Sequence, residues 1–236
     1  MIVFASNGVR LVNTVQSLHG LGELLGVKER QEREKEAVGR AILDAARDLF
    51  VSVGYPHVSI RKIAERIEYS PAAIYSYFPS KDDIFYALAE EGFLMLSDRV
   101  RITPGPDALE DVRRVCWSFY AFSKEHPEHY ALMFLDRSVP RISRDWGRFG
   151  FVHEMQQDAA RRIQRAIDDG FFPPHTDARA ALLVLVAAVH GAAAMCLCDR
   201  MAFGEDPNAL ARDTLEATIA GLRTGITQTF RPDSTH

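Results

Sequence analysis

The amino-acid sequence predicts an all-α protein in which a small N-terminal domain precedes a larger helical one. Apolar residues recur at helical spacing along almost the whole chain, and no alternating stretch bounded by hairpin turns indicates a strand. Serine and aspartate stand where helices would begin, and glycine and proline stand where helices would end. A length of 236 residues with 47% hydrophobic content is sufficient for a substantial buried core.

Composition narrows the classes of protein. The net charge of -4 excludes a globally basic surface, so any contact with nucleic acid has to be local. The three cysteines form no C-x-x-C pair and no disulfide framework, and we expect no secretory leader, which together predict a cytoplasmic protein. The long apolar run from Ala180 to Leu197 is interpreted as a buried helix and not a membrane span, because nearly half of it is alanine or glycine.

The first element in chain order is an extension over residues 1–27. Four glycines interrupt its weakly amphipathic pattern and it has no cap signals, so we expect it to be loose, disordered or marginally helical. From Lys28 the charges alternate in sign, which favours a solvated helix that continues into an apolar stretch and ends at Gly54.

The helices that follow are placed by their caps and breakers. Ser59, Ser70 and Ser80 each precede a helical stretch and can cap it, and Pro71 favours a helix start after Ser70. The segment from Thr103 to Pro106 breaks the chain. Beyond it the spacing predicts helices over Asp107–Lys124, Pro127–Asp136, Phe149–Asp169, Asp177–Asp199 and Pro207–Thr229.

The stretch from Ser59 to Phe78 predicts two short helices joined by a tight turn. Small residues keep the start of the second helix slim enough for a DNA major groove, which is about 12 Å wide. Between Ser59 and Lys81 four basic residues oppose two acidic ones, so the local balance is positive in a negative chain. A capped helical hairpin with an ordinary charged surface would show the same pattern.

Residues 40–95 resemble the DNA-binding region of TetR-family repressors through the skeleton LF...GY...S...IA...S...IY.YF.SKD.I. The resemblance implies a three-helix helix-turn-helix domain over residues 28–82, whose recognition helix spans Ser70–Tyr77. Many relatives have Gly, Lys or Thr where this chain has Ala72 and Ala73, so direct readout by hydrogen bonds would be limited, and methyl contacts or DNA shape would contribute more here. The residues assigned to DNA are Ser59, Arg61, Lys62, Ser70, Pro71, Ala72, Ala73, Tyr75, Ser76, Tyr77 and Lys81.

The same resemblance implies that residues 83–229 bind a small molecule and form a homodimer, with residues 230–236 as a tail. Val189-His190-Gly191 is similar to the Trp-His-Gly motif of one subgroup, with valine in place of tryptophan. Small residues at helical spacing predict a dimer contact, although packing inside one subunit would give the same stripe. These residues are Ala187, Gly191, Ala194 and Cys198.

Aromatic residues concentrated in the larger domain can line an apolar effector pocket or form plain core. His190 is open to two interpretations in the same way, as an effector contact or as a hydrogen-bonded buried histidine. The residues assigned to the pocket are Trp117, Tyr120, Tyr130, Phe134, Phe149 and His190.

The sequence thus predicts a regulator that binds operator DNA, most simply a repressor released by a small apolar or aromatic effector. No catalytic motif appears, and His126 with His129 lacks a third nearby ligand, so we expect neither an enzyme nor a metal or cofactor. The alternatives are a small-molecule-binding helical protein without a role at DNA and, less favoured, an enzyme.

Overall fold

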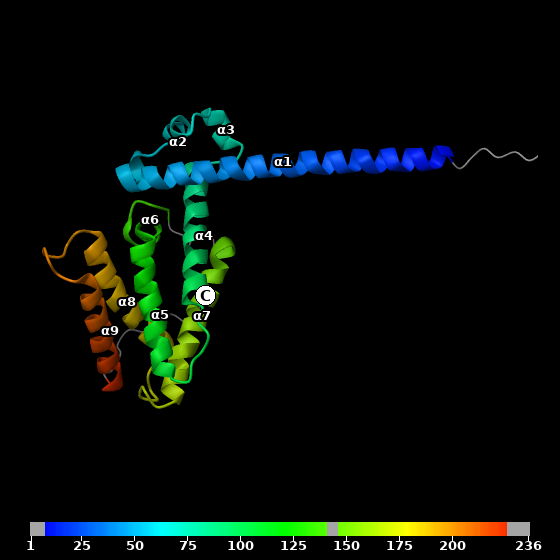
Figure 1. The fold of residues 1–236 in the computed structure, drawn as a ribbon. Helices are drawn as coiled ribbons and strands as arrows, with labels where there is room; N and C mark the ends of the chain where they lie inside the picture. The colour runs from blue at the N-terminus through cyan, green and yellow to red at the C-terminus, as the bar shows by residue number, and fades with distance from the viewer. Residues whose placement is uncertain (1–7, 141–145, 226–236) are drawn as a thin grey trace, which may run out of the picture.

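The structure, a computed structural model, describes the chain over residues 8–140 and 146–225, with side chains from residue 28 to 140 and from 147 to 225. Every regular element in these ranges is helical, which confirms the predicted fold class (Figure 1). The elements are α1 (Gly8–Val53), η1 (Tyr55–His57), α2 (Ile60–Arg66), α3 (Pro71–Tyr75), α4 (Lys81–Val100), α5 (Ala108–Glu125), α6 (Pro127–Tyr130), η2 (Ala131–Leu135), α7 (Trp146–Asp168), α8 (Ala178–Leu197) and α9 (Pro207–Arg223).

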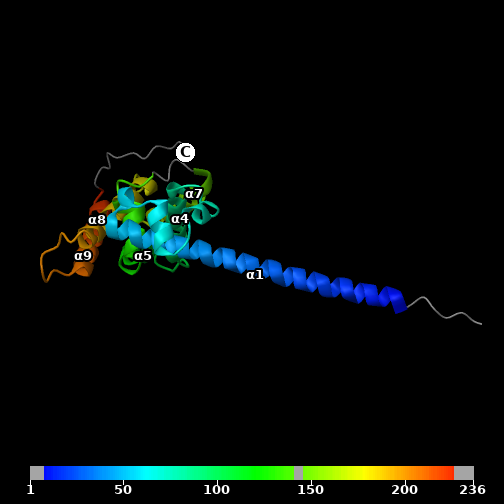
Figure 2. The same ribbon diagram turned by 90° about the horizontal axis from the view of Figure 1, so that it is seen from above.

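Helix α1 is much longer than the sequence indicated. Its backbone is helical from Gly8, which is the helical one of the states predicted for this extension; residues 1–7 lie outside the described part of the chain. Viewed from above, the first half of α1 projects from the side of the molecule (Figure 2). The difference has a physical reason: once a helix is nucleated, each further residue adds a hydrogen bond, and no proline in this stretch stops that growth.

The helix starts predicted from serine are confirmed. The hydroxyl oxygen of Ser59 accepts a hydrogen bond from the amide of Lys62, and that of Ser70 accepts one from the amide of Ala73. Ser80 caps α4 in the same manner. Each cap contributes about 1 kcal/mol to helix stability. The turn between α2 and α3 contains Glu68 at a φ of 60°, a left-handed conformation that glycine adopts more easily.

The second half of α1 packs on α2 and α3 to form the small N-terminal domain. Its core includes Phe50 from α1, Ile63 from α2 and Ile74 from α3, all buried, with Phe78 packed partly buried against them. The predicted core of the helix-turn-helix is therefore present, and Phe78 lies at its edge.

Helix α4 runs away from α1 and joins the small domain to the larger one (Figure 1). Helices α5 and α7 pack beside it, and α8 and α9 form a pair on the outer side. Two predicted helices differ from the structure: residues 127–135 divide into α6 and the π-helical η2, and α7 is kinked at Phe149. The last helix ends at Arg223 with Thr224 as its C-terminal cap, earlier than the predicted end at Thr229, which lies outside the described residues.

A buried carboxylate fixes the start of α5 in the larger domain. Asp111 is 2% exposed, and its oxygens accept hydrogen bonds from the amide of Gly105, at 2.9 Å, and from the guanidinium groups of Arg114 and Arg165, each at 3.2 Å. The loop before α5, the helix itself and α7 therefore meet at the Asp111 side chain.

Helix α8 is long and apolar enough to cross a membrane when judged by length and composition alone, and no other helix in the described residues is. In this fold it packs against α5, α7 and α9, with Leu185 and Val189 fully buried. One side of α8 is therefore part of the core, as the sequence predicts, but only 39% of its apolar window is buried, because the opposite side is exposed.

Candidate functional site

Helix α3 lies at the outer surface of the small domain. Figure 1 shows α2 and α3 on one side of α1 and the larger domain on the other, so the rest of the described chain does not cover them. Pro71 and Ala72 at the start of α3 are exposed and Ala73 is half-buried. A slender, uncovered helix start of this kind fits the width of a major groove.

Three of the four basic residues between Ser59 and Lys81 have partners within the chain. The guanidinium of Arg61 lies 2.9 Å from the carboxylate of Glu65, and its side chain is 81% exposed. The ammonium of Lys62 donates to the carbonyl of His57, and that of Lys81 donates to the carbonyl of Tyr55 and stands over its ring at 4.0 Å. Exposed pairs are weak, so Arg61 and Lys62 can exchange them for phosphate, whereas Lys81 also anchors the start of α4.

Two of the three serine hydroxyls at this surface cap the N-termini of helices. The oxygens of Ser59 and Ser70 accept hydrogen bonds from backbone amides. The hydrogen of each hydroxyl is therefore free to donate to a phosphate oxygen. Ser76 instead donates to the carbonyl of Ala73 at 2.7 Å. Donation from Ser76 to a phosphate would require that bond to break, whereas its oxygen can still accept a hydrogen bond.

The two tyrosines of the predicted recognition helix differ in exposure. Tyr75 is 54% exposed and ends α3, whereas Tyr77 is half-buried and its ring faces Gly39 of α1. The helix is also shorter than the predicted Ser70–Tyr77, because Ser76 is its C-terminal cap and Tyr77 lies in the following turn.

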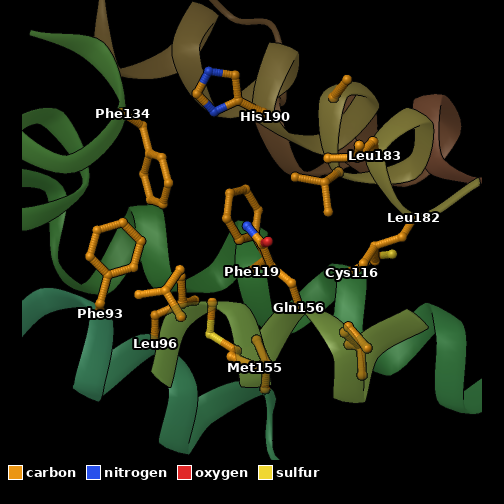
Figure 3. Close-up of a pocket in the computed structure, with 16 residues that line it drawn as sticks. Phe93, Leu96, Cys116, Phe119, Phe134, Met155, Gln156, Leu182, Leu183 and His190 are labelled. Atoms are coloured by element: carbon orange, nitrogen blue, oxygen red, sulfur yellow. The ribbon is translucent and has the colours of Figure 1, made fainter. Parts of the chain in front are cut away.

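A second candidate site is a cavity of about 350 Å³ inside the larger domain. It lies between α4, α5, α7 and α8, and Phe134 of η2 closes one end (Figure 3). Three of its lining residues, Gln156, Leu183 and Ala187, are exposed, so the cavity opens to solvent between α7 and α8. A volume of this size falls within the range of small-molecule sites.

Of the six residues predicted for an effector pocket, only Phe134 and His190 line this cavity. Tyr130 stands behind His190, and Phe149 is buried against Phe93 with ring centroids 6.0 Å apart. Trp117 and Tyr120 lie on the opposite face of α5, where Trp117 contacts Arg212 and Tyr120 donates to Asn208, both of α9. Aromatic content alone does not distinguish the two faces of α5.

His190 combines the two interpretations that the sequence left open. Its Nδ1 lies 2.6 Å from the hydroxyl of Tyr130, and its ring also borders the cavity. Burial lowers the pKa of His190 and raises the pKa of Tyr130, so both groups are uncharged at neutral pH. Burial likewise raises the pKa of the Cys116 thiol, another lining group, to about 12.

Sequence reasoning missed most of the lining, including Gln156 of α7. Val152, Met155 and Ala159 of the same helix also line the cavity. Their spacing of three and four residues is the signal of an inward face, and Gln156 is a polar residue within that face. In Figure 3 its amide points from α7 into the cavity toward α8.

The small domain contacts the cavity wall at a junction, which is formed by Arg40 of α1, Glu91 and Gly92 of α4, and His129 and Met133. A side chain at Gly92 of α4 would collide with Met133, because an added Cβ would stand 2.5 Å from its sulfur. Beside it, His129 Nε2 is 3.4 Å from a carboxylate oxygen of Glu91, whose other oxygen pairs with Arg40 of α1 at 2.5 Å. Met133 belongs to the same π-helical turn as Phe134, so the cavity and α1 are linked through a few side chains.

The junction makes stability sensitive to acid. Burial, partly offset by Glu91, lowers the pKa of His129 below its usual value near 6.5. The unfolded chain therefore takes up this proton first as the pH falls, so the stabilisation from neutral His129 is complete above about pH 6.5 and declines below it.

We expect the free energy of unfolding, measured with denaturant, to fall between pH 7.5 and 5.5, and to fall less in a His129→Gln variant. The matched control is His175→Gln, which removes an exposed imidazole and should keep the wild-type slope. Equal slopes for all three proteins would contradict the role of His129.

The outer face of α8 consists of small and apolar residues. Ala187, Gly191 and Cys198 are exposed and Ala194 is half-buried. A Cβ added at Gly191 would meet nothing within 4 Å. Leu183, Val184 and Met195, each between 37% and 43% exposed, continue the same surface. The residues predicted for a dimer contact thus lie on an apolar surface that the described chain does not cover.

No group of three or more histidine, cysteine, aspartate or glutamate side chains with metal-binding geometry occurs among the described residues. His126 and His129 are near each other, with ring centroids 6.3 Å apart, but are not joined by a third ligand there.

Two family profiles match the chain, and together they cover more than half of it. The profile described as "Bacterial regulatory proteins, tetR family" matches residues 42–88. The profile described as "Tetracyclin repressor-like, C-terminal domain" matches residues 112–218. The first match covers α2 and α3, and the second covers most of the cavity wall.

Individual relatives agree with these profiles. The HTH-type transcriptional repressor Rv1474c of Mycobacterium tuberculosis is 42% identical over 52 residues, which are 22% of this chain and 28% of that protein. The repressor KstR of Rhodococcus jostii is 32% identical over 88 residues, or 37% and 38% of the two chains. The chain thus spans well under half the length of these curated relatives. The solved fatty acid degradation regulator FadR of Bacillus halodurans shares the fold, with a TM-score of 0.63 and 18% identity over 78% of this chain and 99% of that one.

Proposed function

Because this chain belongs to the TetR family of bacterial regulatory proteins, we propose that it is a transcriptional repressor that binds operator DNA as a homodimer and is released by a small-molecule effector. In this proposal residues 28–82 form the DNA-binding domain and the residues from 83 onward bind the effector and the second subunit. The family is one of regulators and not of enzymes, and a cytoplasmic location fits a protein that acts on DNA.

The observation that carries the proposal is the outward position of α3. Its first residues are uncovered, Ser70 caps it, and exposed basic side chains flank it on α2. Phosphate contacts from α2 would position the domain, and Ala72 and Ala73 would approach the bases closely enough for methyl contacts. Two such domains in a dimer would enter successive major grooves about 34 Å apart.

The coupling between effector and DNA would run through the junction between Phe134, Met133 and α4. An effector that fits the cavity only in one arrangement of these helices shifts the spacing of the two recognition helices. Its effect on DNA binding equals its differential affinity for the two arrangements, typically about 1–3 kcal/mol.

The test is DNA binding by an Ala72→Glu variant, with DNA fragments first selected from the source genome by the wild-type protein. A carboxylate on this exposed position would face phosphates, and like charges across an interface cost several kcal/mol, so we expect affinity to fall at least about tenfold in fluorescence anisotropy. Ala72 is preferable to Lys81 for this purpose because Lys81 also holds the start of α4.

The control is Gln157→Glu on α7, which adds the same charge to an exposed position of the larger domain. It should bind DNA like the wild type. If Ala72→Glu also binds like the wild type, or if no fragment is selected, the alternative of a small-molecule-binding helical protein without a role at DNA is favoured.

A further inference from the structure

The walls of the cavity carry no charge. None of its 16 lining residues is lysine, arginine, aspartate or glutamate, and most are aliphatic or aromatic. A carboxylate or ammonium group placed inside would lose its water without gaining an opposite charge, which is strongly unfavourable. The chemistry of the walls therefore selects against a charged group held inside the cavity.

The polar groups at the cavity differ in whether they are free to bind. The Nδ1 atom of His190 is bonded to the Tyr130 hydroxyl at 2.6 Å and its Nε2 atom has no hydrogen bond to a described residue, while the Cys116 thiol is a weak hydrogen-bonding group. The amide of Gln156 points into the space and has no hydrogen bond to any described residue (Figure 3). A side-chain amide both donates and accepts, so it can pair with a hydroxyl or a carbonyl.

The size of the cavity limits the molecule further. A dry protein cavity of about 150 Å³ accepts benzene, so a cavity of about 350 Å³ accommodates a molecule of roughly fourteen non-hydrogen atoms by the same proportion. Two fused rings or a medium-length chain meet that limit.

We infer that the cavity takes an uncharged, largely hydrocarbon molecule with one hydrogen-bonding group, and that the Gln156 amide recognises this group at the opening between α7 and α8. The inference rests on the proposed role of the cavity as the effector site. Gln156 is thus a specificity-determining residue, while the apolar walls contribute affinity for the hydrocarbon part.

Three two-ring probes separate the effects of the hydrocarbon part, the hydrogen-bonding group and the charge on binding affinity. The probes are naphthalene, 2-naphthol and 2-naphthoate, and each is titrated calorimetrically into the full-length protein. We expect 2-naphthol to bind about tenfold more tightly than naphthalene, which corresponds to one hydrogen bond, and at least tenfold more tightly than 2-naphthoate. Binding of naphthoate as tight as that of naphthol, or binding of none of the three, would overturn the inference.

The variant Gln156→Met keeps the length of the side chain and removes its amide. It should bind naphthol and naphthalene within about twofold of each other, while affinity for naphthalene is retained. Gln157→Met, the neighbour whose amide bonds to His153 at the surface, should keep the wild-type preference. A tenfold preference that persists in Gln156→Met would exclude Gln156 as the recognising group.

These outcomes are independent of the DNA test. A protein that binds selected DNA through Ala72 but shows no preference for naphthol retains the proposed function and loses this inference. A protein that shows the Gln156-dependent preference but binds no DNA retains the ligand site and loses the proposed function.

Discussion

Replacing Gly191 by glutamate is expected to convert the proposed dimer into a monomer and to weaken binding to DNA with two half-sites by about 10²–10⁴-fold. Gly191 lies in the middle of the exposed apolar face of α8, and the two copies of a two-fold interface would place the new carboxylates close together. Two linked DNA-binding domains bind far more tightly than one, by about 10²–10⁴-fold, because the second contact is intramolecular.

The glutamate should not disturb the subunit itself. A Cβ at Gly191 has open space around it, and glutamate favours a helix more than glycine does. Gly191→Ala is the matched control and should remain dimeric. Light scattering at micromolar concentration reports the mass, and a dimeric Gly191→Glu protein with unchanged DNA affinity would show that the subunits associate through another surface.

Asp111→Ala is expected to lower the free energy of unfolding by about 1–3 kcal/mol, the cost of leaving a hydrogen-bonding group in the interior without its acceptor, because the side chains of Arg114 and Arg165 are 46% and 38% exposed and can be solvated. The substitution leaves Arg165, Arg114 and the amide of Gly105 without their shared acceptor. Because Asp111 is 2% exposed, water does not readily replace the lost carboxylate.

The neighbouring Glu110→Ala provides the comparison. Glu110 pairs with Arg113 at 3.6 Å but its side chain is 55% exposed, and an exposed pair contributes only about 0–1 kcal/mol. Urea denaturation should therefore show a larger loss of stability for Asp111→Ala than for Glu110→Ala. Similar losses in both would indicate that the Asp111 cluster is not the anchor of α5.

Features governed by local chemistry were predictable from the sequence. The caps at Ser59, Ser70 and Ser80 and the buried positions of Ile63 and Ile74 follow from hydrogen-bonding side chains and from helical spacing. The resemblance then supplied the orientation of α3, since spacing alone could not exclude an ordinary helical hairpin.

Features governed by contacts between distant segments were not predictable. The π-helical turn that contains Met133 and Phe134 is held by packing on α4, and helical spacing does not report it. The division of α5 into a cavity face with Phe119 and an outer face with Trp117 depends on where α9 lies. Gln156 was missed for the same reason, because one glutamine on a helix indicates nothing until the opposing helices are placed.

Leu183 and Ala187 line the cavity and also lie on the exposed face of α8. In the proposed dimer the second subunit would lie across this opening. A molecule already inside would then leave only when the subunits part or α8 shifts, so its residence time would be set by the lifetime of the dimer and not by its own fit to the walls.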